Sequence, residues 1–210
     1  MRVTAHGITK SFSRTLVLDD VSIEFESGCI NVLVAPSGSG KTTLLSILAG
    51  LERPDGGSVA HEVGGHPMLV DPGNVAWVTQ GNNVLAGRSV LDNVLLGPLA
   101  SGVPFDVAAK RALDVLDHVG LRRRATERAR ALSGGELQRL CLARALASPR
   151  RAIFADEPTA HLDEGNTSAF AAALRGVDSS TTILIATHDP VLVDVADRVF
   201  DLRAKRWVRQ

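Results

Sequence analysis

The stretch Ala35-Pro-Ser-Gly-Ser-Gly-Lys-Thr42 decides the fold of this chain of 210 residues. It follows an apolar run that ends at Val34 and leads into the apolar helical pattern of residues 44–48. A glycine-rich turn between a buried strand and a helix exposes consecutive backbone N–H groups at the positive end of the helix. The phosphate-binding pattern G-x-x-x-x-G-K-[ST] describes this turn, except that Ala35 stands at its first glycine position. The stretch therefore predicts a nucleotide-binding loop.

Two side chains at the end of this stretch have the chemistry that a triphosphate requires. Lys41 would reach the β- and γ-phosphates, and the Thr42 hydroxyl would ligate Mg²⁺. A glycine-rich turn into an ordinary helix is the structural alternative. The buried strand before the turn and the apolar helix after it favour the phosphate-binding interpretation.

Apolar runs on both sides of the loop predict an α/β fold with two kinds of strand. Residues Val3 to Thr9 and Val21 to Phe25 alternate apolar and polar side chains, as half-solvated antiparallel strands do. Mostly continuous apolar runs, which are typical of parallel strands covered on both faces, extend over Ile30 to Ala35, Ala152 to Ala155 and Thr182 to Ala186. In such sheets the ligand lies at the carboxyl ends of the parallel strands.

A helical block interrupts this α/β pattern. Between Gly87 and Arg150 the periodicity is helical, and proline and glycine residues divide it. Because α/β patterns stand before and after the block, it is inserted into the core. We therefore expect one domain over residues 1–210, with an α-helical lobe of approximately 87–150 inserted in a P-loop core that also carries an antiparallel β lobe.

The segment Leu132-Ser-Gly-Gly-Glu136 predicts a second anion-binding helix start. Ser133 followed three residues later by Glu136 is a capping box, and the glycines leave the backbone accessible. A well-capped helix without a ligand is the alternative. One nucleotide can use both phosphate-binding helix starts if they come from different copies of the chain.

Composition excludes some functions and locations. The 23 Lys and Arg residues balance the 23 Asp and Glu residues, so no overall field attracts nucleic acid or lipid. No uncharged apolar stretch is long enough to cross a bilayer, so we expect another chain to do so if a membrane is involved. Cys29 and Cys141 fit buried, reduced thiols. We expect His61 and His66 to be solvated loop residues. We expect a solvated face, with contact to lipid headgroups or nucleic acid as the alternative, from Arg122, Arg123, Arg124, Arg128 and Arg130.

With these motifs the chain resembles the nucleotide-binding subunits of ABC transporters over nearly its whole length. The resemblance implies that Phe12 stacks on adenine and that Ser133, Gly134, Gly135 and Glu136 form the signature loop, which contacts ATP bound to another copy. It implies a Walker A loop made of Ala35, Pro36, Ser37, Gly38, Ser39, Gly40, Lys41, Thr42 and Thr43. The family often has Gln where Glu136 stands.

The same resemblance assigns the catalytic and metal-binding residues. Gln80 would contact Mg²⁺ and the attacking water, and Asp156 would hold Mg²⁺ through water. Glu157 would be the general base, and His188 would contact the γ-phosphate. Adjacent carboxylates at a strand end independently suit a division between metal binding and water activation, although ordinary strand-end acids are the alternative. Ala160 to Asp163 resembles the D-loop, where the family more often begins with Ser-Ala.

The implied function is an ATPase with the cofactors ATP and Mg²⁺. It would dimerise on ATP, as a homodimer or as a heterodimer with a similar ATPase, and drive an integral membrane permease from the cytoplasmic, inner face of the membrane. Residues Ser89 to Val94 resemble the small subunits that serve lipoprotein release and macrolide export. One alternative is an ATPase that regulates a membrane complex without transport. The other is a soluble ABC ATPase that acts on nucleic acid or ribosomes, but the long coiled coil, zinc module or second ATPase unit of those families is missing, so no nucleic acid is expected.

Overall fold

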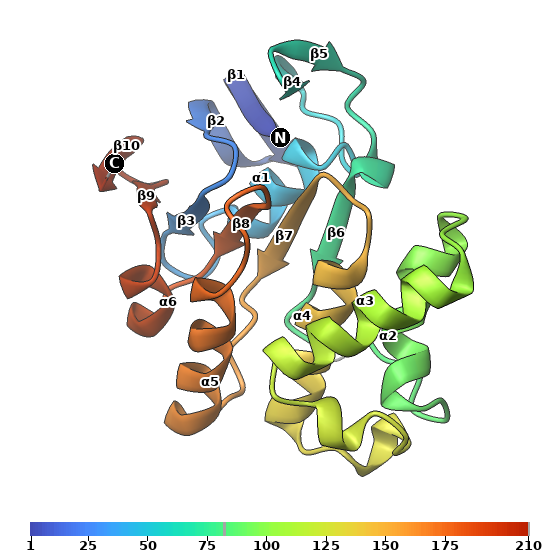
Figure 1. The fold of residues 1–210 in the computed structure, drawn as a ribbon. Helices are drawn as coiled ribbons and strands as arrows, with labels where there is room; N and C mark the ends of the chain where they lie inside the picture. The colour runs from blue at the N-terminus through green and yellow to red at the C-terminus, as the bar shows by residue number, and fades with distance from the viewer. Residues whose placement is uncertain (82, 210) are drawn as a thin grey trace. The chain divides into compact units, whose positions relative to one another are not determined.

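The computed structural model describes residues 1–81 and 83–209, which form two compact units. Unit 1 comprises Met1–Val75, Arg151–Glu157 and Asp178–Gln210. Unit 2 comprises Ala76–Arg150 and Pro158–Val177. Each unit is described by itself below, and Figure 1 labels the elements of both.

An antiparallel sheet of four strands in the order β2-β1-β4-β5 forms one layer of unit 1. Its strands are β1 (Arg2–Phe12), β2 (Thr15–Phe25), β4 (Gly56–Val63) and β5 (His66–Met68). In β1 the side chains of Val3, Ala5 and Ile8 are fully buried, whereas polar residues lie between them. The predicted antiparallel strands at the start of the chain are therefore confirmed.

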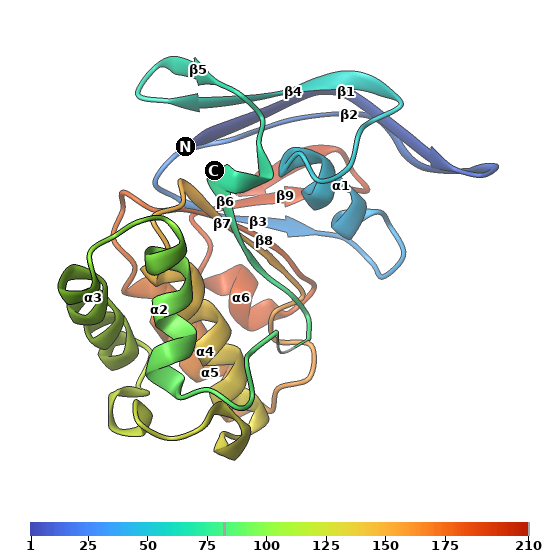
Figure 2. The ribbon, with the colours of Figure 1, turned by 90° about the vertical axis from the view of Figure 1, so that its right-hand side faces the viewer.

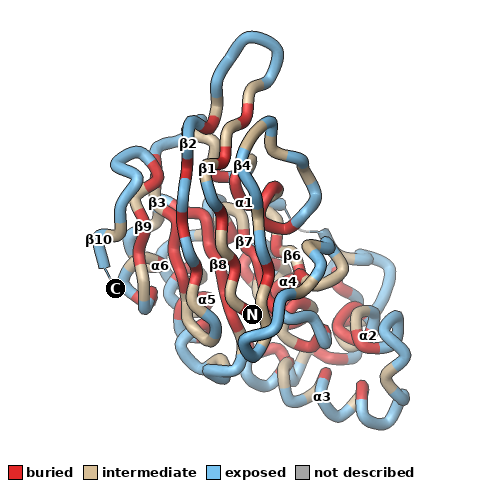
Figure 3. Tube along the Cα trace, turned by 90° about the horizontal axis from the view of Figure 1, so that it is seen from above, coloured by how far each residue is buried: buried red, intermediate tan, exposed pale blue. Residues whose placement is uncertain are grey.

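The second sheet has the strand order β10-β9-β3-β8-β7-β6. Its strands are β3 (Ile30–Val34), β6 (Val75–Val78), β7 (Ala152–Asp156), β8 (Thr182–Ala186), β9 (Arg198–Asp201) and β10 (Arg206–Arg209). Strand β3 pairs in parallel with β8 and β9, and β7 pairs in parallel with β8. Strands β3, β7 and β8 are buried (Figure 3) except at their ends, where Ile30, Val34 and Asp156 are partly exposed, as their mostly apolar sequences predict.

Helix α1 (Lys41–Leu48) lies between the two sheets of unit 1 (Figure 2) and contacts β1, β7 and β8. Leu44, Leu45, Ile47 and Leu48 are at most 1% exposed. Burial of each such side chain contributes about 1.5–3 kcal/mol. Because α1 packs against both sheets, the turn before it is held in place from both sides. A short helix, α6 (Pro190–Asp194), follows β8 and is capped by the Asp189 side chain.

Unit 2 is helical. Its main elements are α2 (Val90–Ala100), α3 (Phe105–His118), α4 (Gly134–Ala147) and α5 (Glu164–Arg175). Helix α4 packs against α2, α3 and α5. The His118 ring is 2.7 Å from the Ala173 carbonyl oxygen and so joins α3 to α5. The helical periodicity of residues 87–150 is confirmed, with turns and two short 3-10 helices between the α-helices.

Three sequence predictions about single residues are wrong, wholly or in part. His61 lies within β4, where its neighbours are β1 and β5, and is only 1% exposed. The glycines that suggested a loop, Gly64 and Gly65, form only the turn after this strand. His66 is exposed as expected, but it begins β5 and does not lie in a loop. Cys29 is partly exposed, whereas Cys141 is buried as expected. Burial raises the pKa of both thiols.

Candidate functional site

The turn between β3 and α1 has the backbone shape of a phosphate-binding loop. Gly38 and Gly40 have φ angles of 78° and 88°, a region that side-chain-bearing residues rarely adopt. A Cβ atom at Gly40 would also lie 2.9 Å from the side chains of Val17 and Leu18. Ala35, which replaces the first glycine of the pattern, has an ordinary negative φ and is buried at the end of β3. The alanine therefore fits the loop without strain.

Lys41, the first residue of α1, reaches back into this turn. Its Nζ atom donates hydrogen bonds to the carbonyl oxygens of Ala35 at 2.7 Å and Pro36 at 3.2 Å. The same atom lies 3.1 Å from Glu157 Oε1. The Lys41 residue is only 6% exposed, and its ammonium group is held where the loop closes around it. It is thus placed to bind an anion that displaces the carboxylate.

Thr42 and Asp156 form an oxygen pair beside Lys41. The Thr42 hydroxyl donates to Asp156 Oδ2 at 2.7 Å, while the buried Asp156 Oδ1 has no hydrogen-bond partner among the described residues. Burial raises the pKa of Asp156, the Glu157 charge raises it further, and Thr42 and Lys41 oppose this. A hydroxyl and a carboxylate with a free, buried oxygen are ligands that suit a hard divalent cation such as Mg²⁺. These residues therefore fit the predicted metal.

Glu157 follows Asp156 in a strained conformation. Its φ angle is 43°, and its amide donates to the Ala186 carbonyl at 2.8 Å, which fixes this backbone against the end of β8. Its carboxylate lies 3.0 Å from His188 Nδ1 and accepts a hydrogen bond from the Thr187 hydroxyl at 3.3 Å. Strain of this kind concentrates at functional sites. Sequence reasoning missed Thr187, although its position directly before His188 was a usable signal.

Phe12 lies near the tip of the β1–β2 hairpin with 48% of its surface exposed, so part of its ring is accessible to a ligand. The Lys10 ammonium lies 5.3 Å from the centre of the ring. Lys10 is itself held by Glu52 at 2.6 Å and Asp55 at 3.4 Å. The cation near the ring restricts its orientation, a contribution that the sequence did not reveal.

The predicted signature loop begins α4 in unit 2. The Ser133 hydroxyl accepts from the Glu136 amide at 3.3 Å, and the Glu136 carboxylate accepts from the Ser133 amide at 2.8 Å. This hydrogen bond from Ser133 lowers the pKa of Glu136, with smaller contributions from Arg124 and Arg139. The predicted capping box is therefore confirmed. Gly134 and Gly135 form the first two positions of the helix.

Gln80 also belongs to unit 2. Its Nε2 atom lies 3.5 Å from His161 Nε2, and the adjacent Thr79 carbonyl accepts a hydrogen bond from Gln138 at 3.2 Å. His161 is one of the two residues, with Ala160, that depart from the D-loop pattern, and its contact with Gln80 was not foreseen. The structure thus gathers Lys41, Thr42, Asp156, Glu157 and His188 in unit 1, whereas Gln80 and the 133–136 loop belong to unit 2.

A groove on unit 2 lies beside the segment that contains Gln80. It has a volume of about 160 Å³ and is lined by residues of β6, α2 and α4, among them Trp77, Leu96, Cys141 and Arg144. The Arg144 guanidinium donates to the Asn83 carbonyl at the edge of the groove. None of the helices in residues 1–81 and 83–209 is both long and apolar enough to span a membrane.

Comparison with known proteins gives consistent results. The family model described as ABC transporter matches residues 18–160. The lipoprotein-releasing system ATP-binding protein LolD of Cereibacter sphaeroides is 39% identical over 218 residues, covering 96% of each chain. The LolD protein of Bacteroides fragilis is 34% identical over 205 residues, covering 93% of this chain and 95% of its own.

Solved structures show the same fold. The dimeric structure of MJ0796, described as a bacterial ABC transporter cassette, matches with a TM-score of 0.79 and 28% identity, covering 95% of this chain and 93% of that one. A second dimeric structure of MJ0796, in a post-hydrolysis state bound to ADP and Pi, has the same TM-score of 0.79 and covers 99% of this chain and 97% of that chain, at 28% identity. The α/β fold predicted from the sequence, that of a P-loop NTPase, is confirmed.

Proposed function

Since the chain belongs to the ABC transporter family of ATP-binding subunits and is an ATPase, we propose that two copies enclose ATP between them and drive a separate membrane permease. The cluster of Lys41, Glu157 and His188 next to the Thr42–Asp156 pair is the observation that carries this proposal. It combines a cation for phosphate, a base for water and ligands for a metal. On this proposal the two units work as one ATPase domain, in which residues 87–150 form the inserted helical lobe.

The residues of unit 1 have complementary roles in phosphoryl transfer to water. Lys41 and the N–H groups at the start of α1 bind the β- and γ-phosphates and stabilise the charge that develops there. Glu157 accepts a proton from the attacking water while the water oxygen bonds to the γ-phosphorus and the bond to the β–γ bridging oxygen breaks. His188, which contacts Glu157, reaches the γ-phosphate. Residues 35–43 surround the phosphates, and Phe12 stacks on adenine.

A magnesium ion, when bound, would neutralise negative charge on the β- and γ-phosphate oxygens. Thr42 would ligate the ion directly, Asp156 would bind it through water, and Gln80 would also contact it. The unpaired, buried Asp156 Oδ1 supports this assignment, because burial of a free carboxylate oxygen is unfavourable until a cation or a water bound to it arrives.

Unit 2 contributes to the ATP that another copy holds. Ser133, Gly134, Gly135 and Glu136 stand at the positive end of a 14-residue helix, where an anion is stabilised. The dimeric MJ0796 structures support an assembly of two such subunits. Lys41, Glu157, His188 and Ser133 are all present in the chain, so a homodimer has two complete ATP sites. In a heterodimer with a similar ATPase, this chain would supply one of the two loops at each site.

The groove lined by Trp77, Leu96 and Arg144 is the surface that we assign to the permease. Its lining combines aromatic and aliphatic side chains with polar ones and with two cations, Arg144 and Arg150, which suits a short amphipathic segment of a membrane protein. The groove lies next to the residues that precede Gln80. The names of the LolD relatives support a role in a lipoprotein-releasing type of system. The chain would then attach to the inner face of the membrane through its partner.

Glu157→Gln tests the dimer. This change keeps the shape of the side chain but removes the base, so ATP should persist and hold two copies together. Gel filtration with ATP and Mg²⁺ should show a dimer, whereas ADP should leave a monomer. Adding Lys41→Ala to the same chain is the matched control and should abolish the dimer. A Glu157→Gln protein that remains monomeric at saturating ATP contradicts the proposal.

A further inference from the structure

The two glycines of the signature loop have different surroundings. A Cβ atom added at Gly134 would meet none of the described atoms within 4 Å beyond its own helix and chain neighbours. A Cβ atom added at Gly135 would lie 2.0 Å from Asn166 Oδ1 and 2.7 Å from Asn166 Cβ. Rotation of the Asn166 side chain cannot relieve the second contact, because the backbone fixes the position of Cβ. The packing of α5 against α4 therefore requires glycine at position 135.

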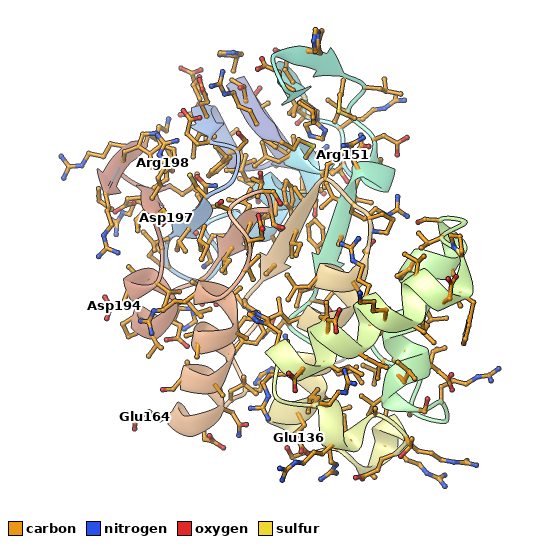
Figure 4. All side chains as sticks on the ribbon, in the orientation of Figure 1. Glu136, Arg151, Glu164, Asp194, Asp197 and Arg198 are labelled. Carbon is orange, nitrogen blue, oxygen red and sulfur yellow. The ribbon has the colours of Figure 1, made fainter. Side chains whose placement is uncertain are left out.

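Asn166 is held in this position by the D-loop, residues 160–163. Its Nδ2 atom donates to Asp163 Oδ2 at 2.8 Å, and its backbone amide donates to Asp163 Oδ1 at 2.8 Å. Asp163 is both the last residue of the D-loop and the N-cap of α5. Figure 4 labels Glu136 and Glu164, which lie at the same end of α4 and α5. One carboxylate thus fixes the side chain that fills the space beside Gly135.

The D-loop also contacts Gln80. His161 Nε2 lies 3.5 Å from the Gln80 amide nitrogen, so residues of one loop contact Gln80 at one end and Asn166 at the other. All of these residues belong to unit 2. The contacts therefore form a continuous series from Gln80 through His161 and Asp163 to the signature loop.

We propose that Asn166 is a positioning residue that joins the signature loop to the D-loop, so that the signature loop meets the partner copy's nucleotide as part of one rigid element. The inference rests on the ATP-bound dimer proposed above. Weakening this junction lets the two loops move separately. That lowers the affinity of one ATP-loaded copy for another, but it leaves the affinity of a single copy for ATP unchanged, since the unit 1 cluster binds that ATP.

The hydrogen bond to Asp163 is tested in the Glu157→Gln background, where dimerisation can be followed by gel filtration or light scattering. Asn166→Asp keeps the shape of the side chain but replaces the donor with a second carboxylate. The ATP concentration for half-maximal dimerisation should rise about three- to tenfold, the usual effect of losing one hydrogen bond. The reciprocal pair Asn166→Asp with Asp163→Asn places a donor opposite an acceptor again and should restore most of the affinity. An Asn166→Asp variant that dimerises like its parent, or a reciprocal pair that restores nothing, overturns the proposal.

Thermal unfolding tests the packing separately. Gly135→Ala should lower the melting temperature by about 3 °C or more, whereas Gly134→Ala should leave it nearly unchanged. Adding Asn166→Gly to Gly135→Ala should recover part of the loss. The matched control is Ser168→Gly, which places the same flexible residue at an exposed position of α5 and should recover nothing. Equal melting temperatures for the two alanine variants contradict the inferred contact.

The two proposals fail in different ways. If the Glu157→Gln parent itself does not dimerise with ATP, the proposed function is wrong, and the melting temperatures still report the contact between Gly135 and Asn166. If the parent dimerises and the Asn166 variants match it, only the positioning role is wrong.

Discussion

The two glycine-containing helix starts of this chain are built in opposite ways. Helix α1 begins after Gly40, which has no side chain to cap it, and its first turn carries no acidic residue. Helix α4 begins after Ser133, whose hydroxyl and amide both pair with Glu136 in the first turn. The first N–H groups of a helix have no partner within the helix. At α1 they are left for a ligand, whereas at α4 side chains of the loop itself already satisfy part of them.

This difference explains why the two loops would act in sequence. The Glu136 carboxylate, whose pKa the hydrogen bond from Ser133 lowers, places a negative charge at the start of α4, and this charge opposes a phosphate arriving from solution. The turn between β3 and α1, called the α1 loop below, holds the buried Lys41 side chain instead. One copy would therefore bind ATP through α1, and α4 would add its contribution only when another copy presents the phosphates in a fixed position.

Lys41→Ala gives the largest expected effect and tests the role of the helix start at α1 in binding ATP. Loss of the Lys41 ammonium should lower kcat by at least about a hundredfold, the usual effect of removing one group that stabilises developing charge. ATP binding by single copies should also weaken. Steady-state phosphate release and nucleotide titration measure the two effects. Lys110→Ala, at an exposed position of α3, is the control and should behave like the parent.

Ser133→Ala should have a smaller effect and only on dimerisation. The change removes the acceptor for the Glu136 amide, which costs about 1 kcal/mol of stability and lowers the melting temperature by about 2–4 °C. In the Glu157→Gln background more ATP should be needed for the dimer, while ATP binding to a single copy is unchanged. Parallel titrations of binding and dimerisation separate the two. If ATP binding and dimerisation weaken equally, the two loops do not have the separate roles that this comparison assigns to them.

The sequence predicts the α1 loop and the parallel strands because their signals are short and continuous. Residues 35–42 and the apolar runs before and after them describe local geometry that tertiary packing only reinforces. The positive φ of Glu157 is not visible in that pattern, since it depends on the hydrogen bond from its amide to Ala186 on a neighbouring strand. The contact of Asn166 with Gly135 likewise depends on how closely α5 approaches α4.

His61 shows the same limit of prediction from sequence, and it contacts the other end of α1. Its burial comes from the pairing of β4 with both β1 and β5, which joins segments far apart in the sequence. Its Nε2 atom lies 2.7 Å from the carbonyl oxygen of Leu48, the last residue of α1. The helix that has no side-chain cap at its phosphate-binding end is therefore held at its far end by a histidine.

This anchor predicts the smallest of the expected effects, a loss of stability in mild acid. Burial lowers the pKa of His61, the N-terminal ammonium lowers it further, and the hydrogen bond to Leu48 opposes this. Because the unfolded chain then binds a proton more readily than the folded one, stability is fully present above the unfolded pKa of about 6.5 and falls as the pH drops below it. His61→Gln keeps a donor for Leu48 but does not titrate, so its melting temperature should fall less between pH 7 and pH 5 than that of the parent. His66→Gln, at an exposed position of β5, is the matched control and should follow the parent. Equal pH profiles for the His61→Gln protein and the parent would mean that no uncharged imidazole holds the far end of α1. The phosphate-binding end of the helix would then be supported by the apolar contacts of α1 alone.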